Sequence, residues 1–245
     1  MESELLKAKI ASNLAEIKAV VSRAARISGR EPGDITILAI SKRQPNEVIE
    51  AAYGCGVLTF GESYVQEALV KIDYFKMFDD IRWEMVGHIQ SRKARLVAEN
   101  FHTVHSLDSL KLTGLLDKHR PEGMPPLEVF LEVNIGDESS KKGFQANDEK
   151  DWQALLPVVK QITSKRKLTL VGLMAMPPLF PDPEQSRPFF QKLYQLQKFL
   201  NDEAADGRLS QLSAGTSADF EIAIEEGATT VRIGERLLGP RIYRD

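Results

Sequence analysis

The sequence predicts an α/β protein: a single (β/α)8 TIM-type barrel with an extra N-terminal helix, forming one domain over residues 1–245. Three observations lead to this prediction. Short apolar, β-branched runs alternate with amphipathic helical patterns, eight such runs occur, and 245 residues with 42% hydrophobic content can form one large core. Alternating strands and helices give right-handed βαβ units and a parallel sheet. Eight units of this length favour a closed barrel over an open sheet.

The first expected element is a helix that precedes the barrel. Its apolar residues recur at intervals of three and four, which makes one apolar stripe. The stripe consists of Leu6, Ile10, Leu14, Ile17, Val21 and Ala24. Gly29 and the pair Pro32-Gly33 are expected to end the helix. We expect it to pack outside the barrel or across its floor.

The eight expected strands are short runs rich in Val, Ile, Leu, Phe and Thr. They begin at Ile35 (ITILAI), Val57 (VLTF), Trp83 (WEMVG), Phe101 (FHTVHS), Leu127 (LEVFLEVNI), Leu168 (LTLVGLM), Leu212 (Leu212-Ser213) and Thr229 (TTVRIG). Apolar residues spaced for helices lie between them, as in the segments 107–115, 152–162 and 189–200. The last of these helices, ADFEIAIEEGA, is expected to begin near Thr216-Ser217 and to stop at Gly227, a glycine suited to follow a helix.

Composition excludes several classes of protein. The net charge of −3 argues against binding to nucleic-acid backbones, which needs clustered positive charge. The single cysteine, Cys55, permits no intrachain disulfide and fits a reducing compartment. The N-terminal segment does not resemble a signal peptide, and no stretch approaches the roughly 18 apolar residues of a membrane span. The four histidines show no metal-binding spacing. We expect a cytoplasmic protein without a metal.

Lys42 directly follows the first expected strand. It should therefore lie at the carboxyl end of the barrel, where this fold builds its sites. A lysine amine there can condense with an aldehyde to form a Schiff base. Free lysine titrates near pH ~10.4, so burial and a neighbouring cation such as Arg43 or Arg232 would have to lower its pKa. The alternative is an ordinary solvated loop charge.

The loops after the last two strands are rich in small residues. SAGTSAD follows the seventh strand, and Gly234 ends the eighth before a short expected helical turn. Small residues and helix N-termini offer backbone N–H groups to an anion, and this fold often binds phosphate at these two loops. Thr216 or Ser217 could instead cap the following helix, and the two interpretations are compatible.

Barrel closure pairs the eighth strand with the first, so we expect Arg232 near Lys42. An amine, an anion site and an arginine in one cleft indicate pyridoxal 5′-phosphate (PLP). The amine would bind the aldehyde, the loops would hold the phosphate, and Arg232 would face the ring nitrogen. The permanent charge of Arg232 would then keep that nitrogen unprotonated. The alternative for Arg232 is an ion pair inside the barrel, with Glu132 or Glu221.

The motifs together resemble the pyridoxal phosphate homeostasis protein family. They follow in the family's order over nearly the whole chain: AISKRQP, FGESYVQE, WEMVGHIQSRK, VHSLDS, LEVNIG, KKGF, GLMAMP, LSAGTSADFEIAI and ATTVRIGERLLG. The resemblance implies a fold-type III barrel, similar to the barrel domain of alanine racemase, that carries PLP on Lys42 as a Schiff base. It also implies that Arg232 faces the pyridine nitrogen, and that the phosphate is held by Ser213, Ser217 and the backbone N–H groups of Gly234 and Glu235.

Three residues depart from the family pattern. Ser63 stands where members usually carry Asn, while Ala214 and Thr216 replace two methionines. We therefore expect an altered polar contact and altered packing near the cofactor. His88 has two interpretations, a structural hydrogen bond to a neighbouring strand end or a contact with the cofactor.

We expect a non-catalytic protein that holds this small-molecule cofactor and delivers it to PLP-dependent apoenzymes, and the resemblance likewise implies a role in PLP homeostasis. We also expect a monomer. The alternative is a PLP-dependent amino-acid racemase, which needs an acid/base group on each face of the substrate carbon. Lys42 could serve one face, and Tyr243 is a candidate for the other unless it is only a packing anchor. A third interpretation, an aldolase that uses the same lysine, is disfavoured by the ordered motifs.

Overall fold

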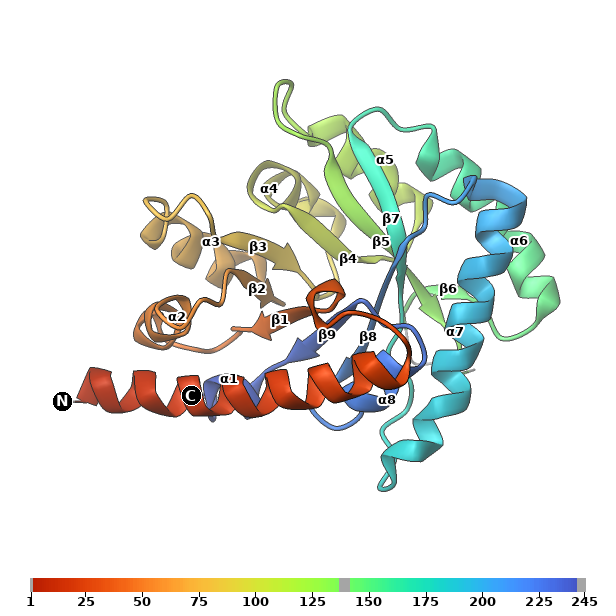
Figure 1. Cartoon of the computed structure of the whole chain (residues 1–245). Coiled ribbons are helices and arrows are strands. Elements are labelled where there is room, and N and C mark those ends of the chain that lie inside the picture. Colours follow the sequence, from red (N-terminus) through yellow and green to blue (C-terminus); the bar gives the residue numbers. More distant parts are fainter. Residues whose placement is uncertain (1, 137–141, 242–245) are drawn as a thin grey trace.

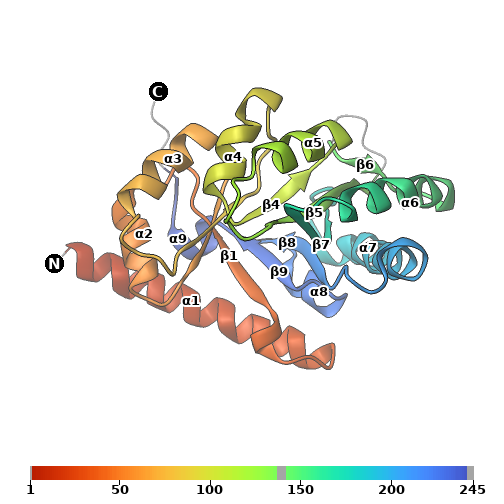
Figure 2. The ribbon, with the colours of Figure 1, turned by 90° about the horizontal axis from the view of Figure 1, so that it is seen from above.

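The computed structural model describes residues 2–136 and 142–241, and these form a parallel barrel surrounded by helices (Figure 1). The strands follow one another in the order β4-β3-β2-β1-β9-β8-β7-β5-β6, and a further β4–β5 pairing closes the ring. Seen from above, the helices surround the strands (Figure 2). The predicted TIM-type barrel is confirmed.

The eight predicted runs all form strands of the closed ring. The strands are β1 (Thr36–Ile40), β2 (Thr59–Glu62), β3 (Arg82–Met85), β4 (Thr103–Leu107), β5 (Leu127–Asn134), β6 (Phe144–Gln145), β7 (Leu168–Met174), β8 (Gln211–Thr216) and β9 (Thr230–Ile233). The short strand β6 was not expected. It pairs with the end of β5 outside the ring, Val133 with Phe144 and Asn134 with Gln145. Two residues are too few to show the alternation that marks a strand in sequence.

The helices occupy the connections between the strands. They are α1 (Glu2–Ile27), α2 (Asn46–Tyr53), α3 (Val65–Tyr74), α4 (Ala94–Asn100), α5 (Leu110–His119), α6 (Glu149–Thr163), α7 (Arg187–Leu200), α8 (Phe220–Glu225) and α9 (Glu235–Leu238). Within the described part of the chain, no helix is both long enough and apolar enough to span a membrane.

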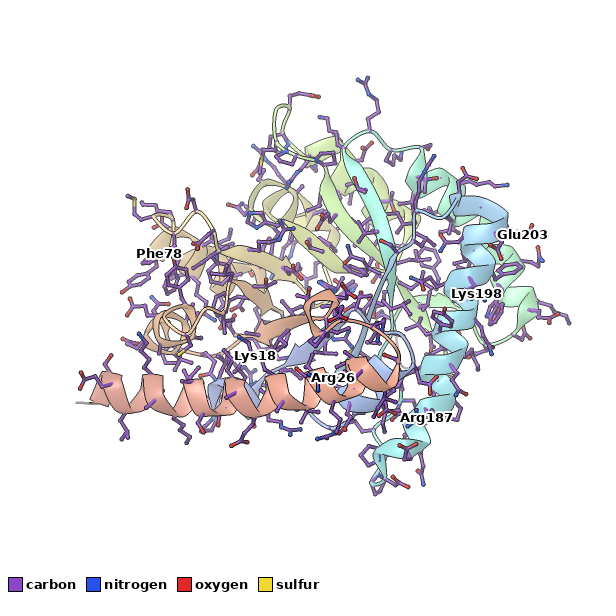
Figure 3. The ribbon with its side chains drawn as sticks, in the orientation of Figure 1. Lys18, Arg26, Phe78, Arg187, Lys198 and Glu203 are labelled. Carbon is purple, nitrogen blue, oxygen red and sulfur yellow. The ribbon has the colours of Figure 1, made fainter. Side chains whose placement is uncertain are left out.

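The N-terminal helix α1 packs outside the barrel, which is one of the two arrangements that the sequence predicted. It contacts α2, α8 and α9. Five members of the predicted stripe are buried, from Ile10 to Ala24, and Leu6 is partly buried. Lys18 and Arg26 lie on the opposite, exposed face of the helix (Figure 3). The stripe therefore attaches α1 to the barrel's outer helices through apolar contacts, and Asn13 adds a hydrogen bond to the backbone oxygen of Leu237 on α9.

The N-terminus of α8 differs from the expectation. The strand β8 continues to Thr216, and the helix begins only at Phe220. The carboxylate of Asp219 accepts hydrogen bonds from the backbone N–H of Thr216 at 2.7 Å and from its hydroxyl at 3.1 Å. Neither Thr216 nor Ser217 caps the helix, so that interpretation is wrong. Gly227 follows the helix with a φ of +107°, as predicted.

The apolar side chains of the protein form two separate buried clusters. The large apolar core lies between the strands and the surrounding helices, whereas a small cluster of Phe130, Val171 and Met174 forms a second one. Buried polar residues accompany this second cluster, among them His105, Ser213 and Arg232. The polar side chains give the barrel a charged interior directly below its carboxyl end.

Candidate functional site

A cavity of about 970 Å³ opens where the carboxyl ends of the strands meet. Residues at or after β1, β2, β3, β4, β5, β7, β8 and β9 line it. Its volume suits a small-molecule ligand. The location is the one at which TIM-type barrels bind their ligands.

Five of the six predicted site residues line this one cavity: Lys42, Ser217, Arg232, Gly234 and Glu235. Strand pairing brings them together, since β1 and β9 are parallel neighbours with Leu38 opposite Arg232 and Ala39 opposite Ile233. A Cβ added to Gly234 would lie 3.7 Å from Cβ of Ile40, two residues before Lys42. The sixth residue, Ser213, is fully buried and is not part of the cavity wall.

Lys42 is half-buried, and burial lowers its pKa below the ordinary lysine value. The Arg241 and Arg43 guanidinium groups lower this pKa further, while the Glu62 and Glu67 carboxylates raise it. The expected direction is thus correct, and Arg43 contributes as expected. The stronger cation is Arg241, which the sequence analysis did not single out. A lowered pKa increases the fraction of neutral, nucleophilic amine at neutral pH.

Arg232 is held in one orientation by uncharged acceptors. Its Nη1 donates to the backbone oxygen and to Oγ of Ser213, both at 2.8 Å, and its Nη2 donates to the backbone oxygen of Ala175 at 3.0 Å. Burial lowers the pKa of Arg232 to about 10, against the opposing attraction of Asp219 and Glu132. The guanidinium therefore stays charged at neutral pH.

The alternative of an ion pair between Arg232 and a glutamate is wrong for both candidates. Glu221 pairs instead with Arg23 of α1, at 2.5 Å on the outside of the protein. Glu132 forms no ion pair with Arg232, although each favours the charged form of the other. Arg232 thus has no carboxylate partner within the described residues and can offer its charge to the cavity.

Ser213 belongs to a buried chain of hydrogen bonds behind Arg232. Its Oγ lies 2.8 Å from Nδ1 of His105, and Nε2 of His105 lies 2.6 Å from Oε2 of Glu84. The His105 ring stacks on Phe130 with 4.4 Å between ring centroids. If Nε2 carries the proton, the donors run in one direction: Arg232 to Ser213, Ser213 to His105, and His105 to Glu84. These contacts use the Ser213 hydroxyl to orient Arg232, and the phosphate contact of Ser213 stays a prediction.

The other predicted phosphate residues form the wall where β8 and β9 end. Ser217 follows β8, and Gly234 directly precedes α9, whose first N–H groups have no partner within the helix. Nη1 of Arg236 donates to the backbone oxygen of Ser217 at 3.3 Å and so ties the two loops together. Gly215 has a φ of +88°, and a Cβ there would come within 2.6 Å of Cβ of Ala223. The loop can therefore close on α8 only with glycine.

Arg241 is a site residue that the sequence analysis missed. It lines the cavity, its Nη1 lies 3.5 Å from Oε1 of Glu235, and its Nη2 lies 3.1 Å from a Cβ placed on Gly234. Its Nε is buried and has no hydrogen-bond partner among residues 2–136 and 142–241. A buried donor without a partner is costly, and an anion at the start of α9 would satisfy it. The residues present therefore fit a phosphate group.

Charge in the cavity wall favours an anion in general. Among the described lining residues, four further cations accompany Arg232 and Arg241, whereas the carboxylates are two, Glu132 and Glu235. These four cations are Lys42, Lys93, Lys142 and Arg236. Burial and the nearby Asp108 raise the pKa of Glu132 to about 7, although the positive charges of Arg232 and Lys142 act to lower it. Glu132 can therefore exchange a proton near neutral pH.

Ser63, Thr216 and His88 also line the cavity, whereas Ala214 is buried in the outer core. The departures at Ser63 and Thr216 thus lie at the site itself. Nδ1 of His88 lies 2.8 Å from Oδ2 of Asp108, just past the end of β4. This is the structural hydrogen bond to a neighbouring strand end that one interpretation expected. The ring still reaches the cavity wall.

Known proteins resemble this chain over most of its length. The alanine racemase N-terminal domain family matches residues 8–241. The pyridoxal phosphate homeostasis protein of Pseudomonas aeruginosa is 41% identical over 235 residues, which cover 96% of each chain. The structure of PipY from Synechococcus elongatus with PLP bound has a TM-score of 0.80 and 31% identity, and covers 94% of this chain and 100% of PipY. Alanine racemase from Corynebacterium glutamicum, with a TM-score of 0.64 and 14% identity over 94% of this chain and 60% of the racemase, shares the fold alone. On this identity over almost the entire length, the protein belongs to the pyridoxal phosphate homeostasis protein family.

Proposed function

We propose that this protein binds PLP in the barrel cavity, limits the concentration of the free aldehyde and delivers the cofactor to PLP-dependent apoenzymes. One observation carries the proposal: a lysine with a lowered pKa shares a cation-rich cavity with an anion site at the ends of β8 and β9. A relative bears the name pyridoxal phosphate homeostasis protein, and PipY was solved with PLP bound. Both facts support the proposal.

Each group of the cofactor has matching residues in the cavity. Ser217, the N–H groups of Gly234 and Glu235, and the guanidinium of Arg241 would hold the phosphate. Arg232 would face the pyridine nitrogen, and its fixed charge would oppose protonation there. When bound, PLP supplies an aldehyde with which a primary amine condenses reversibly, and Lys42 provides that amine.

The phosphate-binding residues and Lys42 have different roles, and together these roles suit a protein that holds PLP and releases it again. The phosphate contacts are charge-assisted and give affinity, while the reversible bond to Lys42 allows the cofactor to leave. Leu179 and Met176 at the rim are 78% and 49% exposed, so an open mouth remains. We further propose that the protein acts as a monomer, since described residues at or after each of the eight strands of the ring line the cavity.

A racemase remains the second candidate because of Glu132. The strands β1 and β5 are separated by three strands on either side of the ring, so Lys42 and Glu132 belong to opposite walls of the cavity. A carboxyl with a pKa of about 7 could hold or release a proton there. The other candidate, Tyr243, lies outside the described residues. Deuterium exchange at the α-carbon of alanine, serine and other amino acids, above the rate with free PLP, would favour this activity.

Two measurements test the proposed function. PLP added to the purified protein should produce a new visible absorbance band, and Lys42→Ala should abolish that band. Protein loaded with PLP should then activate an apoenzyme faster than spontaneous release of the cofactor allows. Identical, band-free spectra for both proteins would refute cofactor binding through Lys42. Activation no faster than release would refute delivery alone.

A further inference from the structure

A buried charged cluster lies behind Lys42, between the ends of β1 and β2 and the helix α3. Its centre is Lys71, whose ammonium group lies 2.7 Å from Oε1 of Glu62 and 2.6 Å from Oε1 of Glu67. The Glu62 carboxylate also accepts a hydrogen bond from Oγ of Ser41 at 2.7 Å. The side chain of Lys71 is 5% exposed and that of Glu62 is fully buried. None of these three charged residues lines the cavity.

The cluster binds the backbone on both sides of Lys42. Nζ of Lys71 donates to the backbone oxygen of Ser41 at 2.7 Å, and Oε1 of Glu67 accepts from the backbone N–H of Arg43 at 2.5 Å. Lys71 and Glu67 also form an ion pair with each other. Together they therefore connect the backbone oxygen of Ser41 with the backbone N–H of Arg43, on the two sides of Lys42. Arg43 has a φ of +60°, a conformation that non-glycine residues rarely adopt. A conformation of this kind persists only where the surroundings impose it.

Lys71 itself is unsuited to react with an aldehyde. An ammonium group has three donors, and all three are used, by Ser41, Glu62 and Glu67. Two of these donors are held in ion pairs with carboxylates, whereas burial and two guanidinium groups push Lys42 towards its neutral form. The residues around them therefore give the two lysines different roles: Lys42 can react with an aldehyde, whereas Lys71 holds the backbone beside it.

We propose that the Glu67–Lys71 pair of α3 positions Lys42 by fixing the two peptide groups that flank it. The pair is a positioning device: it does not touch the cavity, and it determines where the lysine amine enters it. The inference deepens the proposed function and rests on it, because the geometry matters only if Lys42 must meet an aldehyde whose phosphate is anchored elsewhere.

The charge of Glu67 and its contact with the backbone predict opposite effects of its removal on the reaction of Lys42 with PLP, so the inference can be tested. The Glu67 carboxylate raises the pKa of Lys42, so its removal should make the amine more readily neutral and more reactive. Loss of the anchor should nevertheless weaken PLP binding. Glu67→Gln removes the charge but keeps an oxygen that can accept from Arg43, whereas Glu67→Ala removes both. Glu99→Ala is the matched control, since Glu99 forms an i,i+4 pair with Arg95 on α4 at 2.7 Å, away from Lys42.

We expect Glu67→Ala to weaken PLP binding about tenfold, the size of one lost hydrogen bond to a charged group. Glu67→Gln should recover part of that loss, and Glu99→Ala should bind like the unmodified protein. PLP affinity is read from the absorbance titration. In cofactor-free protein, the pH dependence of Lys42 acylation, measured by peptide mass spectrometry, should shift to lower pH in both Glu67 variants.

Several results would overturn the inference. Affinity for PLP that is equal in Glu67→Ala and Glu99→Ala would remove the positioning role, and equal losses in Glu67→Ala and Glu67→Gln would show that only charge matters. If Glu67→Ala does not fold, Glu67→Gln decides, and an unchanged acylation profile contradicts the contact. Failure of the unmodified protein to bind PLP would instead refute the proposed function, and the acylation profile would still report on the cluster.

Discussion

The substitution Ser213→Ala separates the residues that orient Arg232 from those that bind phosphate. It removes the Oγ that joins Nη1 of Arg232, at 2.8 Å, to Nδ1 of His105, at 2.8 Å. Arg232 keeps its bonds to the backbone oxygens of Ser213 and Ala175, but Nδ1 of His105 loses its partner, while Nε2 keeps Glu84. A hydrogen bond to a charged group is worth about 1.5–3 kcal/mol and an orphaned buried group costs about 1–3 kcal/mol. Because Arg232 retains its other acceptors, we expect a loss of about 2–4 kcal/mol.

Urea unfolding measures this loss, with Ser164→Ala as control, because the Ser164 hydroxyl donates to the Gln161 backbone oxygen at an exposed position. Binding of inorganic phosphate to the cofactor-free protein is the second readout, and Ser213→Ala should leave it nearly unchanged. A stability loss below about 0.5 kcal/mol, in the range of surface substitutions, would refute the hydrogen-bond chain. Loss of phosphate binding without loss of stability would indicate that Ser213 binds the phosphate.

Three further predictions follow from the same structure. Arg241→Met should weaken phosphate binding and move the acylation profile of Lys42 to higher pH, since Arg241 lowers the pKa of Lys42; an unmoved profile contradicts the electrostatic contact. Glu132 has a pKa of about 7 when folded and about 4.5 when unfolded, so it costs stability progressively as pH rises between these values. Glu132→Gln should therefore stabilise the protein by up to about 3 kcal/mol at pH 8 and by almost nothing at pH 4, and an equal gain at both would be inconsistent with a buried, titrating carboxyl. Ile17→Ala, at a fully buried position on α1, should cost about 2–5 kcal/mol in urea unfolding, whereas Lys18→Ala on the exposed face should cost little.

The barrel could be predicted because its strands are locally distinct. The runs at Ile35, Leu127 and Leu168 are mostly apolar and rich in Leu, Ile and Val, as expected of strands in a parallel sheet covered by helices. Closure of the ring then placed Arg232 and Lys42 on neighbouring strands from topology alone. These two residues and Gly234 were predicted because each stands where a strand ends.

The polar interior could not be predicted, because its members are far apart in sequence. Glu84, His105 and Ser213 come from β3, β4 and β8, and only the closed ring brings them within hydrogen-bond distance. In the sequence they are isolated polar residues within apolar strands, and no spacing rule connects residues across a barrel. The family resemblance alone assigned Ser213 to the phosphate site, and it gave no sign of the contacts with His105 and Arg232.

The charged residues around Lys42 were missed for a different reason. Glu67 and Lys71 are four residues apart on a helix, a spacing that usually indicates a solvated ion pair. Burial of Lys71 against β1 and β2 depends on how α3 packs, which the helix pattern does not specify. Arg241 follows the last helix and belongs to no periodic pattern, so its place beside Gly234 emerges only from the folded chain.

The central claim is that one amine, that of Lys42, lies within reach of an aldehyde whose phosphate is held at the ends of β8 and β9. Borohydride reduction of the protein after incubation with PLP, followed by peptide mass spectrometry, tests it most directly. We expect one phosphopyridoxyl group per chain, on Lys42, and a marked reduction of this labelling by Arg241→Met. Labelling mainly on Lys71, Lys93 or Lys142, or labelling of Lys42 that is indifferent to Arg241, would contradict the account.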